Sequence, residues 1–134
     1  MAYSPNLQRW IDYIEKDHSR ETLSKMLHDD VVFHSPVVHT PQEGKDITML
    51  YLNSAGEVLG GSDFEYVRIV EQGNHAILEF NQVIDGIKID GIDMITWNDD
   101  GQIIEFKVMV RPLKAINKVH QQMGEMLEKM KAAG

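Results

Sequence analysis

One aspartate in an otherwise apolar strand is the residue of this sequence best suited to chemistry. Residues 87–97 alternate with the two-residue period of a β-strand, and one face carries Ile87, Ile89, Gly91, Asp93, Ile95 and Trp97. Burial disfavours the charged form of a carboxyl group and raises its pKa. Asp93 is therefore a candidate general acid or base, able to donate to a carbonyl oxygen or to accept a proton from a carbon acid. The alternative is a structural aspartate bonded to a nearby tyrosine or backbone amide.

Two histidines are the next candidates. His34 and His39 flank Pro36, in a region expected near the mouth of a pocket, and an imidazole can act as a base near neutral pH. Strand parity places His34 opposite Phe33 and Ser35, so only one of these sets can face inward. No His-x-x-x-His pair or carboxylate cluster accompanies His34 or His39, and the sequence predicts neither a metal site nor a cofactor.

Four helices are predicted from capping residues and apolar spacing. Ser4 and Pro5 fit an N-cap and a first helical position, and Ser19 can cap a short helix that ends at Leu27. A third helix runs from about 44 to 59, is ended by Gly60 and Gly61, and carries the face Ile47, Leu50, Tyr51, Ser54 and Val58. The last helix follows Pro112 and carries the stripe Leu113, Ile116, Val119, Met123, Leu127 and Met130.

Strand patterns account for much of the rest. A short strand over 31–35 is stopped by Pro36, and 37–43 is expected to be a loop. Four longer strands are predicted at 64–71, 75–84, 87–97 and 102–110, and Ile104, Phe106, Val108 and Val110 share a face of the last one. Short turns join these strands, so they should pair as an antiparallel meander. Helices segregated from such a sheet define an α+β domain, and the curl of the sheet leaves a pocket.

Composition narrows the class of protein. A chain of 134 residues with 43% hydrophobic and 25% charged residues fits one domain over 1–134. The net charge of -8 argues against nucleic acid and anionic membranes as partners. The absence of cysteine excludes disulfides and thiolate chemistry. There is no signal-peptide pattern at the start and no run of about 18 apolar residues, so a cytoplasmic protein is expected.

The chain resembles the SnoaL-like branch of the nuclear-transport-factor-2-like superfamily. The resemblance rests on LHDDVVFHSP at 27–36 followed by Gly44, and on GIDMITWNDDGQI at 91–103 leading to Val110-Arg111-Pro112. It implies a cone-shaped, curved antiparallel sheet wrapped around an N-terminal helix group, with an additional C-terminal helix. It also implies a homodimer through the outer sheet face. The superfamily includes ketosteroid isomerases, polyketide cyclases and non-enzymatic binding proteins, so fold alone does not name the activity.

Carried over residue by residue, the resemblance argues against ketosteroid isomerisation. Asp93 matches the isomerase's aspartic acid, which bonds the developing enolate oxygen. The isomerase's catalytic base falls on Ser35, and its tyrosine falls near Trp10 or Ile11, with Tyr13 close by. The acidic residue of limonene epoxide hydrolase falls at about Val108. SnoaL-type cyclases use an Asp and a His, which here would be Asp93 with His34 or His39.

The expected pocket is apolar with few polar points. Its predicted lining is Trp10, Tyr13, Phe33, Tyr51, Leu78, Phe80, Gln82, Ile95, Trp97, Phe106 and Val108, beside Asp93. Such a lining suits a small apolar or aromatic molecule with one or two oxygens. The first hypothesis is a cofactor-independent acid-base isomerase or cyclase acting on an apolar ketone or polyketide-like substrate. The alternatives are a non-catalytic hydrophobic-ligand-binding or accessory dimeric domain, and a purely structural dimerisation module.

Overall fold

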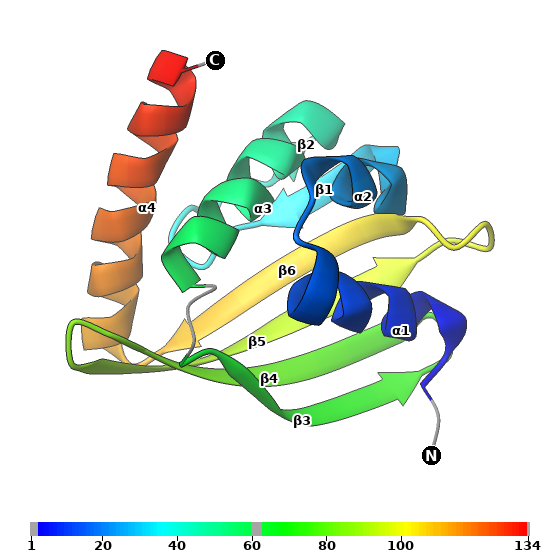
Figure 1. Ribbon diagram of the computed structural model, residues 1–134, viewed down its shortest axis with the longest axis horizontal. Helices are drawn as coiled ribbons and strands as arrows, with labels where there is room; N and C mark the ends of the chain where they lie inside the picture. Colours follow the sequence, from blue (N-terminus) through cyan, green and yellow to red (C-terminus); the bar gives the residue numbers. More distant parts are fainter. Residues whose placement is uncertain (1–2, 60–62, 134) are drawn as a thin grey trace.

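A curved sheet with helices gathered on its concave side forms the body of the protein (Figure 1). The computed structural model describes residues 3–59 and 63–133. Within these residues the sheet has six strands in the order β2-β1-β6-β5-β4-β3. The strands are β1 (Leu27–His34), β2 (Gln42–Glu43), β3 (Glu65–Gln72), β4 (His75–Ile84), β5 (Ile87–Trp97) and β6 (Ile103–Arg111). The helices are α1 (Pro5–Asp12), continued by the π-helix η1 (Tyr13–Asp17), then α2 (Arg20–Met26), α3 (Lys45–Leu59) and α4 (Leu113–Ala133).

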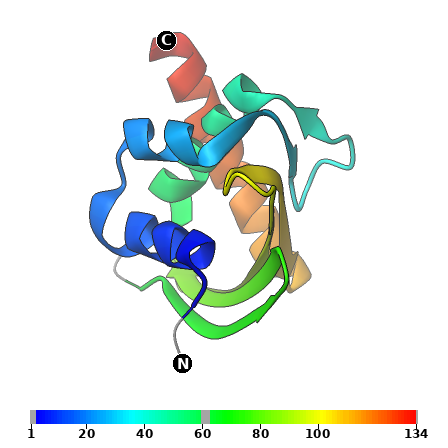
Figure 2. The ribbon, with the colours of Figure 1, turned by 90° about the vertical axis from the view of Figure 1, so that its right-hand side faces the viewer.

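The predicted α+β cone is confirmed. Strands β3 to β6 pair as an antiparallel meander, as expected from the short turns between them. Figure 2 shows the sheet curling so that the helices occupy its concave side. Antiparallel pairing does not hold throughout, because β1 pairs in parallel with β6. This arrangement leaves a hollow between the sheet and the helices.

The first strands differ most from the sequence-based expectation. Strand β1 begins at Leu27, four residues before the predicted start, because Leu27 already pairs with Ile103 of β6. The predicted loop over 37–43 ends in the short strand β2, which pairs with β1. Leu27, Val31 and Phe33 are buried and fix β1 in the core. The extra length was hidden because polar residues 28–30 interrupt the apolar pattern.

A β-bulge changes which residues of β6 face the core. Trp97 of β5 pairs with Ile103, whereas Thr96 pairs with Glu105, so Ile104 is an extra residue on the β6 side. Ile103 is therefore fully buried, and the prediction that Ile104 shares the inward face of Phe106 is wrong. Beyond the bulge, Phe106 and Val108 face inward as predicted, since both line the cavity described below.

The helix starts follow from their caps. Ser4 accepts a hydrogen bond from the Leu7 backbone N–H, and Ser19 accepts one from the Thr22 N–H, as their positions predicted. In α3, Ser54 of the predicted face is buried, whereas Thr48 and Leu52, which are also buried, lie outside that face. Its predicted stop at Gly60 and Gly61 lies outside the described residues.

Helix α4 packs on α3 and on the sheet near its start. Ala115 and Val119 are its buried residues next to Phe80 and Ile89, whereas Leu113, which was predicted in the apolar stripe, is 71% exposed. A larger core cluster joins α1, α2 and β1 to the middle of the sheet. None of the described helices combines the length and apolar character needed to cross a bilayer.

Candidate active site in the cone

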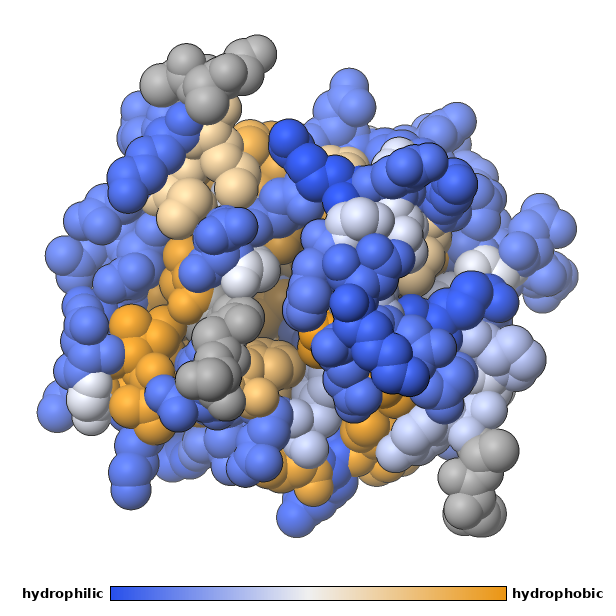
Figure 3. Space-filling model, in the orientation of Figure 1, coloured by the Kyte–Doolittle hydropathy of each residue, from blue (hydrophilic) through white to orange (hydrophobic). Residues whose placement is uncertain are grey.

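A cavity of about 740 Å³ lies between the concave face of the sheet and the helices. Its walls come from α1 and η1, the end of β1 and the loop after it, α3, strands β3 to β6, and α4. Figure 3 shows a hollow near the middle of one face, with apolar surface inside and hydrophilic residues around it. A cavity of this size and character suits a small, mainly apolar molecule.

Asp93 supplies a buried carboxyl group to this cavity. It lies on the inward face of β5, as predicted, and only 8% of its surface is exposed. Its neighbour across the sheet is Leu78, and Val108 is its partner on β6. Phe80 stands beside it and lies directly over Gly91, where a Cβ atom would come 2.3 Å from the Phe80 ring. Glycine at 91 therefore makes room for the ring that forms the cavity wall next to Asp93.

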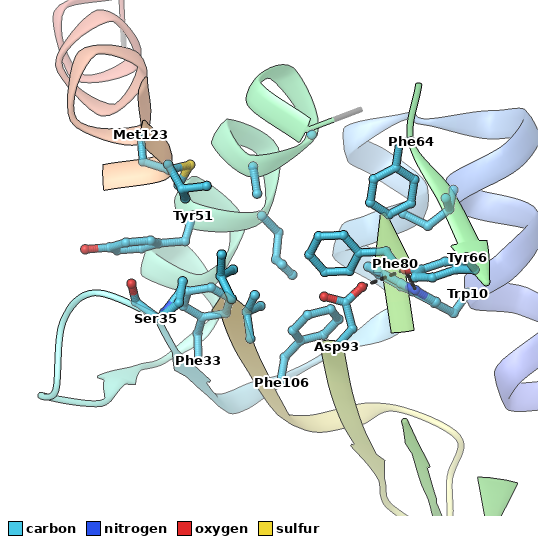
Figure 4. A pocket seen from close by; sticks show the side chains of 18 of the residues that line it. Trp10, Phe33, Ser35, Tyr51, Phe64, Tyr66, Phe80, Asp93, Phe106 and Met123 are labelled. Atoms are coloured by element: carbon cyan, nitrogen blue, oxygen red, sulfur yellow. Dashed lines mark hydrogen bonds between the residues drawn. The ribbon is translucent and has the colours of Figure 1, made fainter. Parts of the chain in front are cut away.

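A chain of two hydrogen bonds holds Asp93. The Tyr66 hydroxyl donates to Asp93 Oδ2 at 2.6 Å, and Trp10 Nε1–H donates to the Tyr66 oxygen at 3.1 Å. Figure 4 shows these three side chains together at one end of the cavity, with Ser35 and Tyr51 on the other side. Because the tyrosine's single proton points at Oδ2, a proton on Asp93 belongs on Oδ1, the oxygen turned away from Tyr66.

Burial sets the protonation behaviour of this pair. Desolvation raises the pKa of Asp93 to about 7, and the hydrogen bond from Tyr66 offsets part of that effect. The pKa of Tyr66 is raised by burial and by the neighbouring Asp93 carboxylate. Asp93 is therefore divided between its acid and base forms at neutral pH, which is the condition that favours a general acid-base group. Tyr66 remains a neutral donor.

Aromatic contacts fix the walls around these polar groups. Trp10 packs against Tyr13 and Phe106, with ring centroids 5.3 and 5.0 Å apart. Phe33 packs against Tyr51 at 5.2 Å on the opposite side. Burial also raises the pKa of Tyr13, with a smaller contribution from Asp17. These contacts leave the ring orientations little freedom, which keeps the cavity open in one shape.

Most of the predicted lining meets in this cavity. The predicted residues that do line it are Trp10, Tyr13, Phe33, Tyr51, Phe80, Phe106, Val108 and Asp93. Leu78, Ile95 and Trp97 were expected there but are absent from the lining, because they are closed within the core cluster beneath it. Gln82 is also buried away from the cavity, and its Oε1 accepts a hydrogen bond from the Val83 N–H.

Neither candidate histidine lies in the cavity. His34 is on the outward face of β1, where its Nε2 lies 3.0 Å from Glu105 Oε2. His39 is exposed in the loop before β2. The parity that separated His34 from Phe33 and Ser35 thus decides against the histidine, since Phe33 and Ser35 line the cavity. The predicted pairing of Asp93 with either histidine is not formed.

Sequence reasoning missed Tyr66, the residue closest to Asp93 in function. Counting back from the β3–β4 turn pairs Tyr66 with Asn81, which faces outward. A bulge at Val67 shifts the register, so that Tyr66 pairs instead with Phe80 and turns inward. The only sequence signal was its spacing of two from Phe64, another lining residue. Among the described residues there is no group of three acidic or histidine side chains placed to hold a metal ion.

The comparisons with known proteins agree with this geometry. The SnoaL-like domain family matches residues 7–106, about three quarters of the chain, and the protein belongs to this family. No match is found among curated proteins. Of the solved structures, a steroid delta-isomerase from Pseudomonas aeruginosa is 34% identical, with a TM-score of 0.81 over 96% of this chain and 90% of that one.

Two other structures show how widely the fold is used. A protein with a cystatin-like fold from Silicibacter pomeroyi DSS-3 is 29% identical, with a TM-score of 0.81 over 90% of this chain and 84% of that one. A proposed SnoaL-like polyketide cyclase from Jannaschia sp. CCS1 is 12% identical, with a TM-score of 0.68 over 87% of this chain and 94% of that one. The latter likeness concerns the fold alone. Activity must therefore be argued from the site.

Proposed function

We propose that this protein is a cofactor-independent acid-base enzyme of isomerase or cyclase type that acts on an apolar ketone or polyketide-like molecule. One observation carries the proposal: the buried Asp93 carboxyl group faces an apolar cavity and is held there by the Tyr66 hydroxyl. The sequence likeness to the Pseudomonas steroid delta-isomerase supports a ketone substrate.

The proposed reaction is a proton shuttle on one carboxyl group. The Asp93 carboxylate accepts a proton at Oδ1 from a carbon next to the substrate carbonyl, and the electrons of the broken C–H bond move into an enolate. The same proton then returns from Oδ1 to another carbon of the conjugated system, which gives an isomer and restores the carboxylate. The enolate oxygen can accept hydrogen bonds from hydroxyl groups of the cavity wall, such as Tyr13, Ser35 or Tyr51.

Ser35 distinguishes this scheme from one with two carboxylates. It lines the cavity at the position that matches the base of ketosteroid isomerases, and its hydroxyl oxygen accepts a hydrogen bond from the Val37 N–H. A serine at this place can donate to an oxygen but cannot serve as a carboxylate base. Asp93 must therefore carry both halves of the proton transfer.

The first test is turnover of an apolar cyclic ketone with an isolated β,γ double bond, followed by the ultraviolet absorbance of the conjugated enone product. Wild-type protein should accelerate the isomerisation, and Asp93→Asn, which keeps the shape of the side chain, should lose the acceleration. Asp90→Asn on the opposite face of β5 is the matched control. Equal turnover by wild type and Asp93→Asn would exclude the proposed role of Asp93.

A second candidate function is non-catalytic binding of a small hydrophobic molecule. It is favoured by Ser35, which leaves Asp93 as the one buried carboxyl group in the described lining. Binding of apolar ketones without turnover of any of them, together with a ligand retained in native mass spectrometry of the purified protein, would select this function.

We further propose a homodimer through the convex face of the sheet. The apolar side chains of Val70, Ile77 and Met109 are exposed on this face. Arg68 and Glu79 form an ion pair with each other on the same face. Val70 and Ile77 are cross-strand neighbours, so they make a continuous apolar strip with a polar border. Analytical ultracentrifugation should give a dimer for the wild type, and Ile77→Arg should shift it to monomer. A monomeric wild type at high protein concentration would exclude the dimer.

A further inference from the structure

The side chains around the cavity that can carry a charge include carboxyl groups, which are negative when ionised, and imidazoles, which can be neutral. Its ionisable lining residues include the carboxyl groups Asp93, Glu15 and Glu65 and the imidazoles His18 and His120. Within residues 3–59 and 63–133, no lysine or arginine is among the lining residues. A ligand inside the cavity therefore meets no permanent positive charge from these residues.

Three cations among the described residues are paired with carboxylates outside the cavity. Arg111 is bonded to Asp90 on the convex face at 2.7 Å, and Lys118 to Asp85 at 2.6 Å. Arg68 pairs with Glu79, also on the convex face. Because these cations are held by carboxylates outside the cavity, they do not compensate a negative charge that enters it.

We propose that the cavity selects uncharged substrates, so that ketones and esters enter it and the corresponding free carboxylates do not. This inference rests on the proposed function and narrows its substrate class. An anion that leaves water for an apolar cavity loses its hydration, and only a paired cation or several donors can compensate that loss. The anion would also approach Asp93, whose ionised form repels it. A ketone oxygen meets neither penalty.

The two histidines do not remove this selectivity. His120 is exposed on α4, and His18 lies at the end of η1, three residues after Glu15. A carboxylate paired with either imidazole would lie at the rim, because both histidines are exposed, and His18 is separated from Trp10 by the Tyr13 ring. Deeper in the cavity, the described lining offers an anion hydroxyl and indole donors beside the Asp93 carboxyl group, and no lysine or arginine.

Two ligands of the same shape test the inference. In 2-acetylnaphthalene a methyl group stands where 2-naphthoate carries a charged oxygen, so the pair differs in charge and hardly in size. Isothermal titration calorimetry at pH 8 should give a dissociation constant for the ketone at least about 100-fold lower than that for the carboxylate. Asp93→Asn should improve carboxylate binding by about tenfold, because it removes the nearest negative charge.

A rim variant provides a second measurement that does not disturb the buried pair. Glu65 is exposed at the start of β3, beside Tyr66, so Glu65→Lys should fold normally and raise the carboxylate affinity several-fold. Glu43→Lys makes the same change of charge on β2, outside the cavity lining, and should leave the ratio of the two affinities unchanged.

The outcomes separate this inference from the function on which it rests. Tight binding of the ketone alone supports both. Carboxylate binding within about threefold of the ketone would overturn the selectivity while leaving the proposed function intact. Binding of neither probe, together with no turnover of a ketone, would overturn the proposed function and the inference with it.

Discussion

Two aspartates on β5 lie three residues apart and face opposite sides of the sheet. Asp90 is on the convex face, where its Oδ2 accepts a hydrogen bond from Arg111 Nη1 at 2.7 Å in contact with water. Asp93 is on the concave face, where its Oδ2 accepts one from the Tyr66 hydroxyl at 2.6 Å in an apolar surrounding. The two hydrogen bonds are nearly equal in length, but their partners differ in charge and their surroundings differ in polarity.

The difference shows which contacts can give a carboxyl group a chemical role. A charged partner in water stabilises the carboxylate and contributes little to folding, typically below about 1 kcal/mol. A neutral partner in an apolar cavity orients the group without fixing its charge, so burial brings the pKa of Asp93 to about 7. Acid-base chemistry is therefore expected on the concave side of the strand.

The largest expected effect is on activity. Asp93→Asn removes the group that carries the proton and should reduce kcat/KM for a ketone substrate by roughly 10² to 10⁴. Asp90→Asn removes a carboxylate of the same strand and should leave kcat/KM within about twofold. Steady-state kinetics of the two variants, measured side by side, test this difference. Similar losses of kcat/KM in both variants would mean that the substitutions disturb strand β5, and would contradict an acid-base role of Asp93.

The second effect is on stability as a function of pH. Asp93 has a folded-state pKa of about 7 against an ordinary value of 3.8, so the folded state holds its proton more tightly than the unfolded state. Its contribution is fully present below pH 3.8 and is lost as the pH rises through about 7. Between pH 5 and pH 8 the wild type should lose roughly 2 to 3 kcal/mol relative to Asp93→Asn.

Urea unfolding at both pH values measures this difference. Asp90→Asn should keep the pH dependence of the wild type, since Asp93 is unchanged in that variant. Parallel pH profiles for the wild type and Asp93→Asn would contradict the raised pKa.

The third effect concerns the orienting hydroxyl. Tyr66→Phe removes the hydrogen bond that lowers the pKa of Asp93, so the midpoint of the pH–rate profile should move above 7, by about one unit. With the carboxylate form starting the reaction, activity at pH 7 should fall by about fivefold and recover at pH 8 to 9. Tyr51→Phe removes a cavity hydroxyl with no bond to Asp93, and its profile should keep the wild-type midpoint. A midpoint that moved downward in Tyr66→Phe would contradict this assignment.

The smallest effect is expected one step further from the carboxyl group. Trp10→Phe keeps an aromatic ring beside Phe106 but removes the N–H that donates to Tyr66. The tyrosine hydroxyl then becomes a weaker and less directed donor, so the midpoint should rise by a few tenths of a unit and activity at pH 7 should fall by about 1.5- to 2-fold. Trp97→Phe, which changes a buried tryptophan outside the cavity, should reduce stability without moving the midpoint.

Local patterns were sufficient to predict most of the fold. The bounds of β4 and β5 agree with the sequence-based ranges, because apolar alternation and the Asp85-Gly86 turn specify both strands. The same alternation placed Asp93 on the inward face. The caps Ser4 and Ser19 marked two helix starts through the hydrogen bonds that they accept. Each of these predictions depended on neighbours in the sequence.

The errors arose where a bulge or a distant contact decides the outcome. The bulges at Val67 and Ile104 reverse which side of the sheet the residues before them face. Tyr66 therefore faces inward, and Ile103 lies in the core. Trp97 and Ile95 share the face of Asp93 but are buried within the core cluster and do not line the cavity. Parity gives the side of the sheet on which a residue lies, whereas the position of the helices decides whether that side is open.

The parallel pairing of β1 with β6 has a consequence for how the chain folds. The strand at 27–34 finds its main partner at 103–111, so the edge of the sheet closes only when the last strand has joined the others. Contacts between such distant segments slow folding, because the loop between them must first be closed. During synthesis, the meander can begin to form strand by strand, whereas β1 cannot pair with β6 until β6 has left the ribosome. A chain that stopped after β5 would therefore expose an unpaired edge on β5 and leave β1 with only β2 as a partner.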